Sequence, residues 1–519
     1  MTALPTSVGN GVRDRSRAAF AETALRVRAD PWTAWVLGIA LVVGLVVRVV
    51  HVNSVGLNSD EAVYSGQAAS IDNKGDFTPY FPVFRAHPLL FQAVLSLVYR
   101  FGVSDLSGRL LSVALGLATV WLTFVLGRIL YNARVGAVAA LLLAVMPYHV
   151  VVSRQILLDG PMTLAATAAL VCMAKFDRTR EPRWILAASG AMALTVLTKE
   201  TSIVLVASAY LYLGLIAAHR RAWTTAAVGL VLIIGLAALH PLVLAIVHHT
   251  GTGNSYLAWQ LSRPSNHTPW FYIRTVPLAM GPLVIAIALA GLAERRGRTS
   301  REVLLVSWAA VPTVFFTVWP IKGFQYLVPA APAVAVLAGS ALMRCTVSWV
   351  RERNRALARI GLIAVATVSI LVPTALRIDG RSATALAGSG GLPGGREVGH
   401  WVAANVPQGA RLVTIGPSMA NVIEWYGDRE CRALSVSTNP LHRNPVYEPI
   451  LNPDLALRSF DYQYIVWDAF SAHRSPHFAA ATMALIHKYH GRVVHVQTLH
   501  GEGTSQSSTP IIVIYQVHP

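Results

Sequence analysis

The stretch Ser54-Val-Gly-Leu-Asn-Ser-Asp-Glu-Ala-Val-Tyr64 follows the first long apolar run of the chain, Trp32–Val50. It places two acids, Asp60 and Glu61, side by side just after a segment long enough to enter a bilayer. Carboxylates at a membrane boundary are costly unless they lie in water or meet cations. The charges that the rest of the chain brings back to this boundary therefore decide how the two acids are interpreted.

The composition is that of a polytopic membrane protein. Of the 519 residues, 54% are hydrophobic and 13% are charged, whereas soluble domains have about 25% charged residues. The net charge of +18 does not indicate a nucleic-acid-binding protein, because the arginines are concentrated in short loops between apolar runs. Three widely separated cysteines, Cys172, Cys345 and Cys431, favour neither a disulfide framework nor a metal site.

Eleven apolar runs are long enough, or nearly so, to cross a bilayer. The first run lacks a clear cleavage site, so we interpret it as a retained span and not as a signal peptide. The predicted spans are 32–50, 105–127, 135–151, 160–175, 184–198, 201–218, 223–247, 272–293, 303–319, 324–343 and 357–375.

The basic loops predict the orientation. If the N-terminal tail, residues 1–31, is cytoplasmic, every dense basic loop falls on the same side, as the positive-inside rule requires. An odd number of spans then places the C-terminus outside. We expect a multi-pass plasma-membrane protein, although an endoplasmic reticulum membrane would show the same sign of charge.

The pattern changes after the last run. Residues 376–395 form a predicted linker with a Gly-rich part, and from 396 to 519 strand-like runs alternate with helical patterns. The predicted fold class is therefore a polytopic α-helical membrane protein with a C-terminal extracytoplasmic α/β domain. Its transmembrane domain covers 32–375 and includes a long first outer loop, 51–104.

Asp60 and Glu61 have two interpretations. In the structural one, they lie in the first turn of a helix capped by Ser59, where acids favour the helix dipole. In the functional one, Asp60 is a general base, and Glu61 binds an acceptor or tunes the pKa of its neighbour.

Further charges lie at the ends of apolar runs on the predicted outer side. His87, in Arg85-Ala-His-Pro88, has three interpretations: an ordinary loop histidine, a hydrogen-bond donor to an anion, or a metal ligand. Arg154 and Asp159 form an ion pair between two helices, or Asp159 orients Arg154 or another cation toward a phosphate.

Two lysines extend this set. Lys199, followed by Glu200, lies between two spans, and Lys322 lies between two others. A single lysine there can simply extend to the interface, but several cations and acids on one face indicate a functional site.

The order of the motifs resembles a known family. Asp60-Glu-x-x-Tyr64, His87-Pro-Leu, Ser153-Arg-x-x-Leu-Leu-Asp-x-Pro161, Leu197-Thr-Lys-Glu200 and Lys322-x-x-x-Tyr326-x-x-Pro-x-x-Pro occur in this order. The set resembles the GT-C glycosyltransferases, in the branch of protein O-mannosyltransferases and lipid A aminoarabinose transferases. The resemblance covers about residues 30–345. It implies a GT-C-like membrane domain and a polyprenyl-phosphate-linked sugar as donor.

The resemblance also implies roles for individual residues. Asp60 matches the catalytic base and Glu61 its acidic neighbour near the acceptor. The cations at the donor phosphate are His87, Arg154, Lys199 and Lys322, and the supporting residues are Tyr64, Asp159, Glu200 and Tyr326. Gln325 departs from the family, in which Arg often precedes the tyrosine, so one phosphate contact is in doubt.

These observations predict a glycosyltransferase that moves a sugar to an acceptor hydroxyl on the outer face with inversion. The base is a carboxylate and cations stabilise the departing phosphate, so no metal or other cofactor is required, although a divalent ion near the acids stays open. The expected partners are the lipid-linked sugar, the membrane, and a protein, lipid or cell-wall glycan as acceptor. The alternative is a transporter or flippase of an anionic lipid-linked substrate, which would be expected to show paired halves.

Overall fold

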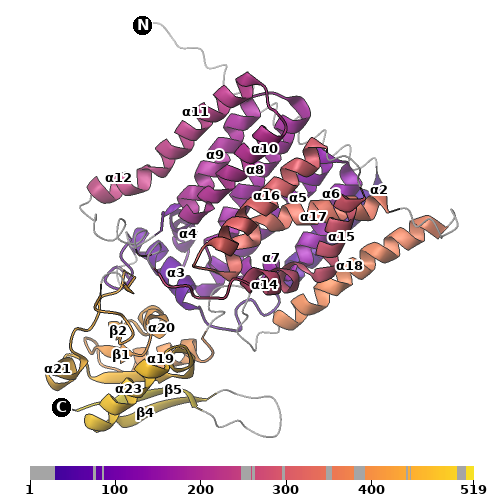
Figure 1. Ribbon diagram of the computed structural model, residues 1–519. Helices are drawn as coiled ribbons and strands as arrows, with labels where there is room; N and C mark the ends of the chain where they lie inside the picture. Colours follow the sequence, from indigo (N-terminus) through magenta and orange to yellow (C-terminus); the bar gives the residue numbers. More distant parts are fainter. Residues whose placement is uncertain are drawn as a thin grey trace, which may run out of the picture.

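The computed structural model describes residues 30–73, 77–83, 87–246, 259, 263–294, 299–345, 354–378, 392–439, 442–444, 446–498 and 510–518. The predicted tail, residues 1–31, and the linker, residues 376–395, lie mostly outside these ranges. A large helical bundle comes first in the chain, and a smaller sheet-containing domain follows it (Figure 1).

The bundle contains helices only. They are α2 (Pro31–Val49), α3 (Ser59–Ile71), α4 (Leu90–Tyr99), α5 (Asp105–Leu130), α6 (Ala133–Val145), α7 (Pro147–Val152), α8 (Asp159–Thr179), α9 (Arg183–Thr198), η1 (Glu200–Ile203), α10 (Val204–Leu215), α11 (Arg220–Ala237), α12 (Leu239–Ile246), α14 (Phe271–Met280), α15 (Pro282–Ala293), α16 (Ser300–Val318), η2 (Phe324–Ala330), α17 (Ala331–Arg344) and α18 (Arg355–Arg377).

The core of the bundle lies around α5, α6 and α17. Nearly every side chain of α6 and α17 is buried, and most of them are small or aliphatic. Glycines allow α5 and α6 to approach closely, since a Cβ on Gly136 would lie 2.4 Å from the Phe124 carbonyl oxygen. Small residues at such crossings are typical of packed membrane helices.

Among the residues that the structure describes, six helices are long and apolar enough to cross a membrane, or seven if the bent pair α14 and α15 is one span. Gly281, at φ 90°, lies at the 97° bend of that pair, and Pro147 begins α7 directly after α6. Several predicted spans are thus broken or short. The prediction of a helical membrane protein is confirmed, whereas the count of eleven spans stays a prediction.

The C-terminal domain has a five-stranded sheet in the order β2-β1-β3-β5-β4. The strands are β1 (Leu412–Thr414), β2 (Cys431–Ala433), β3 (Tyr464–Asp468), β4 (Arg492–Thr498) and β5 (Pro510–Gln516). The first three are parallel, with Leu412 opposite both Cys431 and Tyr464, and β5 runs antiparallel to β3 and β4. The helices are α19 (Gly395–Asn405), α20 (Pro417–Gly427), α21 (Pro453–Arg458), α22 (Ala469–Arg474) and α23 (Pro476–Lys488).

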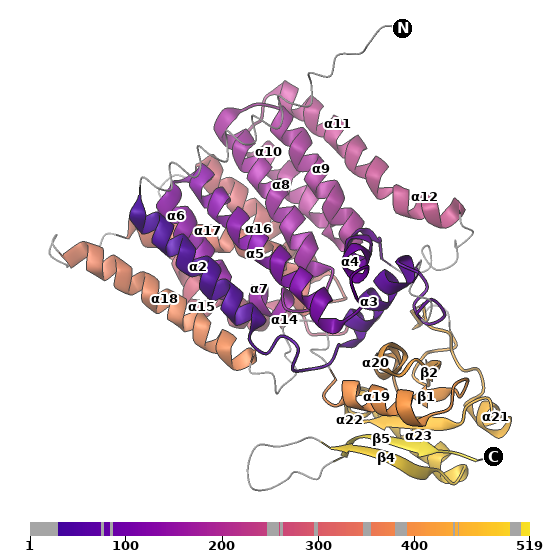
Figure 2. The same cartoon turned by 180° about the vertical axis from the view of Figure 1, so that it is seen from behind.

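The C-terminal domain lies against the end of the bundle that carries α3. Both views place α20 next to α3, with α19 on the other side of α20 (Figure 1 and Figure 2). Asn421 of α20 donates a hydrogen bond from Nδ2 to Oγ of Ser59, the first residue of α3, at 2.8 Å. The start of α3, with Ser59, Asp60 and Glu61, therefore lies at the interface between the bundle and the C-terminal domain.

Candidate active site

Helix α3 begins with a capping box. Asn58 accepts a hydrogen bond at Oδ1 from the Glu61 backbone N–H (2.9 Å), and Glu61 Oε2 accepts one from the Asn58 N–H (3.1 Å). Each side chain thus satisfies a donor that a helix start leaves open. The N-cap is therefore Asn58 and not Ser59, as the structural interpretation of the sequence had it. The Ser59 hydroxyl instead accepts a hydrogen bond from Asn421.

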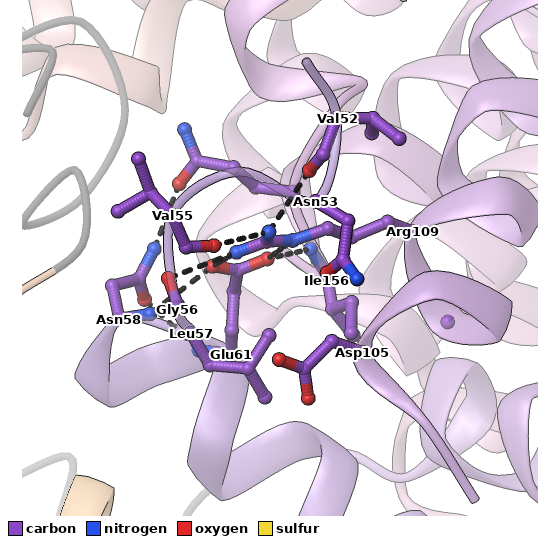
Figure 3. A network of polar contacts seen from close by, with 12 residues as sticks. Val52, Asn53, Val55, Gly56, Leu57, Asn58, Glu61, Asp105, Arg109 and Ile156 are labelled. Atoms are coloured by element: carbon purple, nitrogen blue, oxygen red, sulfur yellow. Dashed lines mark hydrogen bonds and ion pairs between the residues drawn. The ribbon is translucent and has the colours of Figure 1, made fainter. Parts of the chain in front are cut away.

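Glu61 is also the centre of a buried polar network (Figure 3). Arg109 donates from Nε to Oε1 and from Nη2 to Oε2, both at 2.8 Å. The Ile156 N–H donates to Oε1 at 3.0 Å. The same guanidinium donates to the backbone carbonyls of Val52, Val55 and Gly56, so the network fixes the loop before α3.

The network shows that Glu61 holds the start of α3 and the loop before it in place. From the sequence, only the location of Glu61 in the first helical turn could be predicted. The residue is only 1% exposed, and donors from three other residues occupy its oxygens. The acceptor contact expected for Glu61 stays a prediction, and it would compete with these donors.

Asp60 lies next to Glu61 but takes no part in this network. Its side chain is partly exposed, and no residue that the structure describes forms a hydrogen bond or ion pair with it. Burial raises the pKa of the Asp60 carboxyl; the nearby charges of Lys199 and His87 oppose this, and those of Asp159 and Glu61 reinforce it. Asp60 therefore lies close enough to Lys199, His87, Asp159 and Glu61 for their charges to act on its carboxyl.

His87 is held by Glu200. The Nδ1 atom lies 2.9 and 3.0 Å from the two carboxylate oxygens, so we assign it as the protonated donor. The ring of Tyr64 from α3 packs edge-on against the His87 ring, with centroids 6.1 Å apart. Residues far apart in sequence therefore converge beside Asp60.

Lys199 is held by Asp159. The Nζ atom donates to both carboxylate oxygens at 2.9 Å, and both side chains are almost fully buried. The ring of Tyr326 lies over the ammonium group, 5.1 Å from Nζ to the centroid. Of the two partners expected for Asp159, Arg154 or another cation, the ion pair with Arg154 is not formed, and Lys199 is the cation that Asp159 holds.

Arg154 and Lys322 bind backbone carbonyls. Arg154 Nη1 donates to the carbonyls of Val47, Arg48 and Val50 at the end of α2, as a helix C-terminus favours. Lys322 Nζ donates to the Trp319 carbonyl at 2.9 Å. Neither contact reaches the charged cluster of Asp60, His87, Asp159, Lys199 and Glu200, and the phosphate contacts expected for Arg154 and Lys322 stay predictions.

Sequence reasoning missed several residues around the site. Arg109 lies inside a predicted span, and a cation in such a run is a functional signal that could have singled it out. Asp105 accepts from Arg396 Nη2 (2.8 Å) and Trp425 Nε1 (3.1 Å), and from the Tyr426 hydroxyl. No local pattern connects a span with a residue some 300 positions later, so these contacts could not be predicted from the sequence.

The cluster does not form a metal site in the part of the chain that the structure describes. Within it, no group of three or more His, Cys, Asp or Glu side chains is placed to hold an ion. The acids of the cluster are instead paired with Lys199 and His87, apart from Asp60.

Comparison with known proteins points in the same direction as the motifs. Residues 86–245 match the family model described as dolichyl-phosphate-mannose-protein mannosyltransferase. This segment contains His87, Arg154, Asp159, Lys199 and Glu200, but not Asp60. No curated protein sequence matches the chain.

Solved structures match over nearly the whole chain. ArnT from Cupriavidus metallidurans in the apo state has a TM-score of 0.70 at 17% identity, covering 94% of this chain and 98% of that one. The same protein bound to undecaprenyl phosphate has a TM-score of 0.68 at 16% identity, covering 93% and 98%. Archaeal oligosaccharyltransferase AglB from Archaeoglobus fulgidus, in complex with an inhibitory peptide and a dolichol-phosphate, reaches 0.60 at 15%, covering 92% and 74%. At these identities the matches show the fold.

Proposed function

We propose that this chain, which resembles the GT-C glycosyltransferases in its motifs and shares their fold, transfers a sugar from a polyprenyl-phosphate donor to an acceptor hydroxyl. Transfer takes place on the outer side of a plasma membrane, with inversion at the anomeric carbon. The C-terminal domain lies on that side and the N-terminal tail lies in the cytoplasm.

The observation that carries the proposal is the state of Asp60. It is the one acid of the charged cluster that lacks an ion-pair or hydrogen-bond partner among the described residues, whereas Glu200 and Asp159 are paired with His87 and Lys199. A general base needs lone pairs that are available to the proton it removes. Asp60 offers such lone pairs next to two positively charged side chains, Lys199 and His87, whose positions are fixed by their own acids.

The chemistry then follows from the charges. Asp60 removes the proton of the acceptor hydroxyl, and the hydroxyl oxygen attacks the anomeric carbon of the donor sugar. The bond between that carbon and the phosphate oxygen breaks, and the lipid phosphate leaves with the electron pair. Attack on the face opposite the leaving phosphate inverts the anomeric centre.

Lys199 and His87 supply the positive charge for the departing phosphate. Each is held by its own acid, Asp159 or Glu200, so its position is set before the substrate arrives. Preorganised charge of this kind stabilises a developing anion without further rearrangement. The mechanism needs no metal. The sugar is a hexose or pentose, and the acceptor is a protein, a lipid or a cell-wall glycan.

The test is sugar transfer by Asp60→Asn. Membranes that contain the full chain receive a radiolabelled polyprenyl-phosphate sugar, and label in the acceptor fractions is followed. Loss of a general base lowers the rate about 10²–10⁴-fold. Asp72→Asn, at the other end of the same helix, is the matched control, and a wild-type rate with Asp60→Asn would show that Asp60 is not the base.

A further inference from the structure

The C-terminal domain contains a crevice of about 370 Å³ that the proposed transfer does not use. Most of its lining comes from the segments that follow the three parallel strands, and the remaining lining residues are Trp259, His442, Arg443, Asn444 and Tyr447. Gly416, Pro417 and Ser418 follow β1, Ser435, Val436 and Ser437 follow β2, and Phe470, Ser471, Arg474 and Ser475 follow β3. The crevice is therefore located at the carboxyl edge of the parallel part of the sheet.

The sheet topology makes this edge a ligand-binding position. From β1 the chain passes through α20 to β2 on one side, and it then crosses to β3 on the other side of β1. In open α/β sheets, ligands bind outside the carboxyl ends of the strands where the strand order changes direction. Helix α20 also starts at the crevice without a side-chain cap, so its N-terminus favours negative charge.

The lining has the chemistry of a saccharide site that carries positive charge. Among its residues are the five serines Ser418, Ser435, Ser437, Ser471 and Ser475. Hydroxyls of this kind can both donate to and accept from sugar hydroxyls. The aromatic rings of Trp259, Tyr447 and Phe470 provide apolar faces next to them.

Two arginines set the charge of the crevice. Arg474 lies over the Phe470 ring at 5.3 Å, and Arg443 donates to the Thr438 carbonyl at 3.4 Å. Neither forms an ion pair with an acid that the structure describes, and the described lining contains no Asp or Glu. Guanidinium groups without carboxylate partners are suited to bind a phosphate or carboxylate of a ligand. We propose that this crevice binds an anionic saccharide.

Two hydrogen bonds link the lining of the crevice to the start of α3, which carries Asp60. Tyr447 lines it, and the Tyr447 hydroxyl accepts a hydrogen bond from Asn421 Nδ2 at 3.0 Å. The same Nδ2 atom donates to Ser59 Oγ, and Ser59 directly precedes Asp60. That the bound saccharide is part of the acceptor rests on the proposed function; the binding site itself does not.

Binding is tested with the full chain in detergent micelles by saturation-transfer NMR. The probes are mannose 6-phosphate and glucuronic acid, with mannose as the neutral counterpart, so that the two sources of negative charge are compared. We expect stronger binding of at least one anionic probe than of mannose. We expect Arg474→Gln combined with Arg443→Gln to weaken that binding at least tenfold, and 0.5 M salt to weaken it as well.

Arg458→Gln is the matched control, because Arg458 is an exposed arginine of the same domain outside the crevice. Equal binding of mannose and both anionic probes, or binding that survives the double substitution, would overturn the proposal. The Asp60→Asn variant separates the two hypotheses, since it is expected to lose transfer and to keep probe binding: loss of transfer tests the proposed base, and probe binding tests the crevice. In a transfer assay, the double substitution raises KM for an anionic acceptor and leaves kcat unchanged, and an unchanged KM would remove the crevice from the acceptor path.

Discussion

Arg109 of α5 and Glu61 of α3 form an ion pair with two parallel hydrogen bonds of 2.8 Å, in which the side chains are 5% and 1% exposed. The pair connects a predicted span with the helix that carries Asp60. Because the guanidinium also binds three carbonyls of the preceding loop, it sets the direction in which α3 leaves that loop. The position of Asp60 thus depends on a residue inside the bundle.

Replacing Arg109 should destabilise the protein strongly. Arg109→Gln leaves the Glu61 carboxylate buried without its counter-charge, and breaking such a pair costs about 3–5 kcal/mol. Thermal unfolding in detergent measures the effect. Arg134→Gln is the control, because its ion pair with Asp30 is largely exposed, and exposed pairs contribute about 0–1 kcal/mol.

Glu61→Gln then separates positioning from acceptor binding. If Glu61 positions α3, stability and transfer fall together in this variant. A loss of transfer at unchanged stability, with KM for the acceptor raised, would instead support a direct acceptor contact.

Transfer should depend on pH through Asp60. Because burial raises the pKa of the Asp60 carboxyl, the base is protonated, and the rate falls, at a higher pH than an ordinary aspartate near 3.9 would give. His87→Gln removes a positive charge that lowers this pKa, so the acidic limb of the rate profile should move to still higher pH. An unmoved limb, relative to the exposed-site control His487→Gln, would contradict this assignment.

Lys199 should act through its charge and not only through its ion pair. In the proposed mechanism Lys199 stabilises the departing phosphate, so we expect Lys199→Gln to lower kcat about 10²–10³-fold. The variant also leaves Asp159 buried without a partner, so stability falls. Adding Asp159→Asn removes that carboxylate charge and should restore much of the stability but none of the rate. Recovery of the rate in the double variant would reduce the pair to a structural element.

Tyr426 should hold the loop before α3. Its hydroxyl accepts from the Leu57 N–H at 2.8 Å and donates to Asp105. Tyr426→Phe leaves the Leu57 N–H unsatisfied, at a cost of about 1–3 kcal/mol, while Asp105 keeps its hydrogen bonds from Arg396 and Trp425. Hydrogen exchange measured by mass spectrometry should become faster over residues 52–58. Tyr462→Phe in the same domain is the control, and equal exchange in both variants would exclude this role.

The sequence was enough to select the charged residues of the candidate site but not to predict which of them form ion pairs with each other. Asp159 and Lys199, which flank predicted spans, are visible locally, because charged residues interrupt a hydrophobic pattern. The pairing of Lys199 with Asp159, and of His87 with Glu200, depends on how helices rotate and pack. Arg154 and Lys322 show the same limit, since both face backbone carbonyls.

The fold shows a similar division. The helical membrane domain follows from composition, and strand-like runs mark β1, β3, β4 and β5. The short strand β2, Cys431–Ala433, has no sequence pattern of its own because three residues are too few to show alternation. Without β2, the edge where the crevice lies could not be located from the sequence.

Asp105 is the first residue of α5, and it binds Arg396, Trp425 and Tyr426 of the C-terminal domain. Together with the Asn421–Ser59 and Tyr426–Leu57 hydrogen bonds, these contacts hold the domain on the bundle in addition to its covalent connection to α18. Because the domain contacts the bundle at several residues, it does not rotate about its covalent connection alone. The crevice and Asp60 are therefore held at a fixed separation. If the crevice holds part of the acceptor, as proposed, this fixed separation would select acceptors by length as well as by charge.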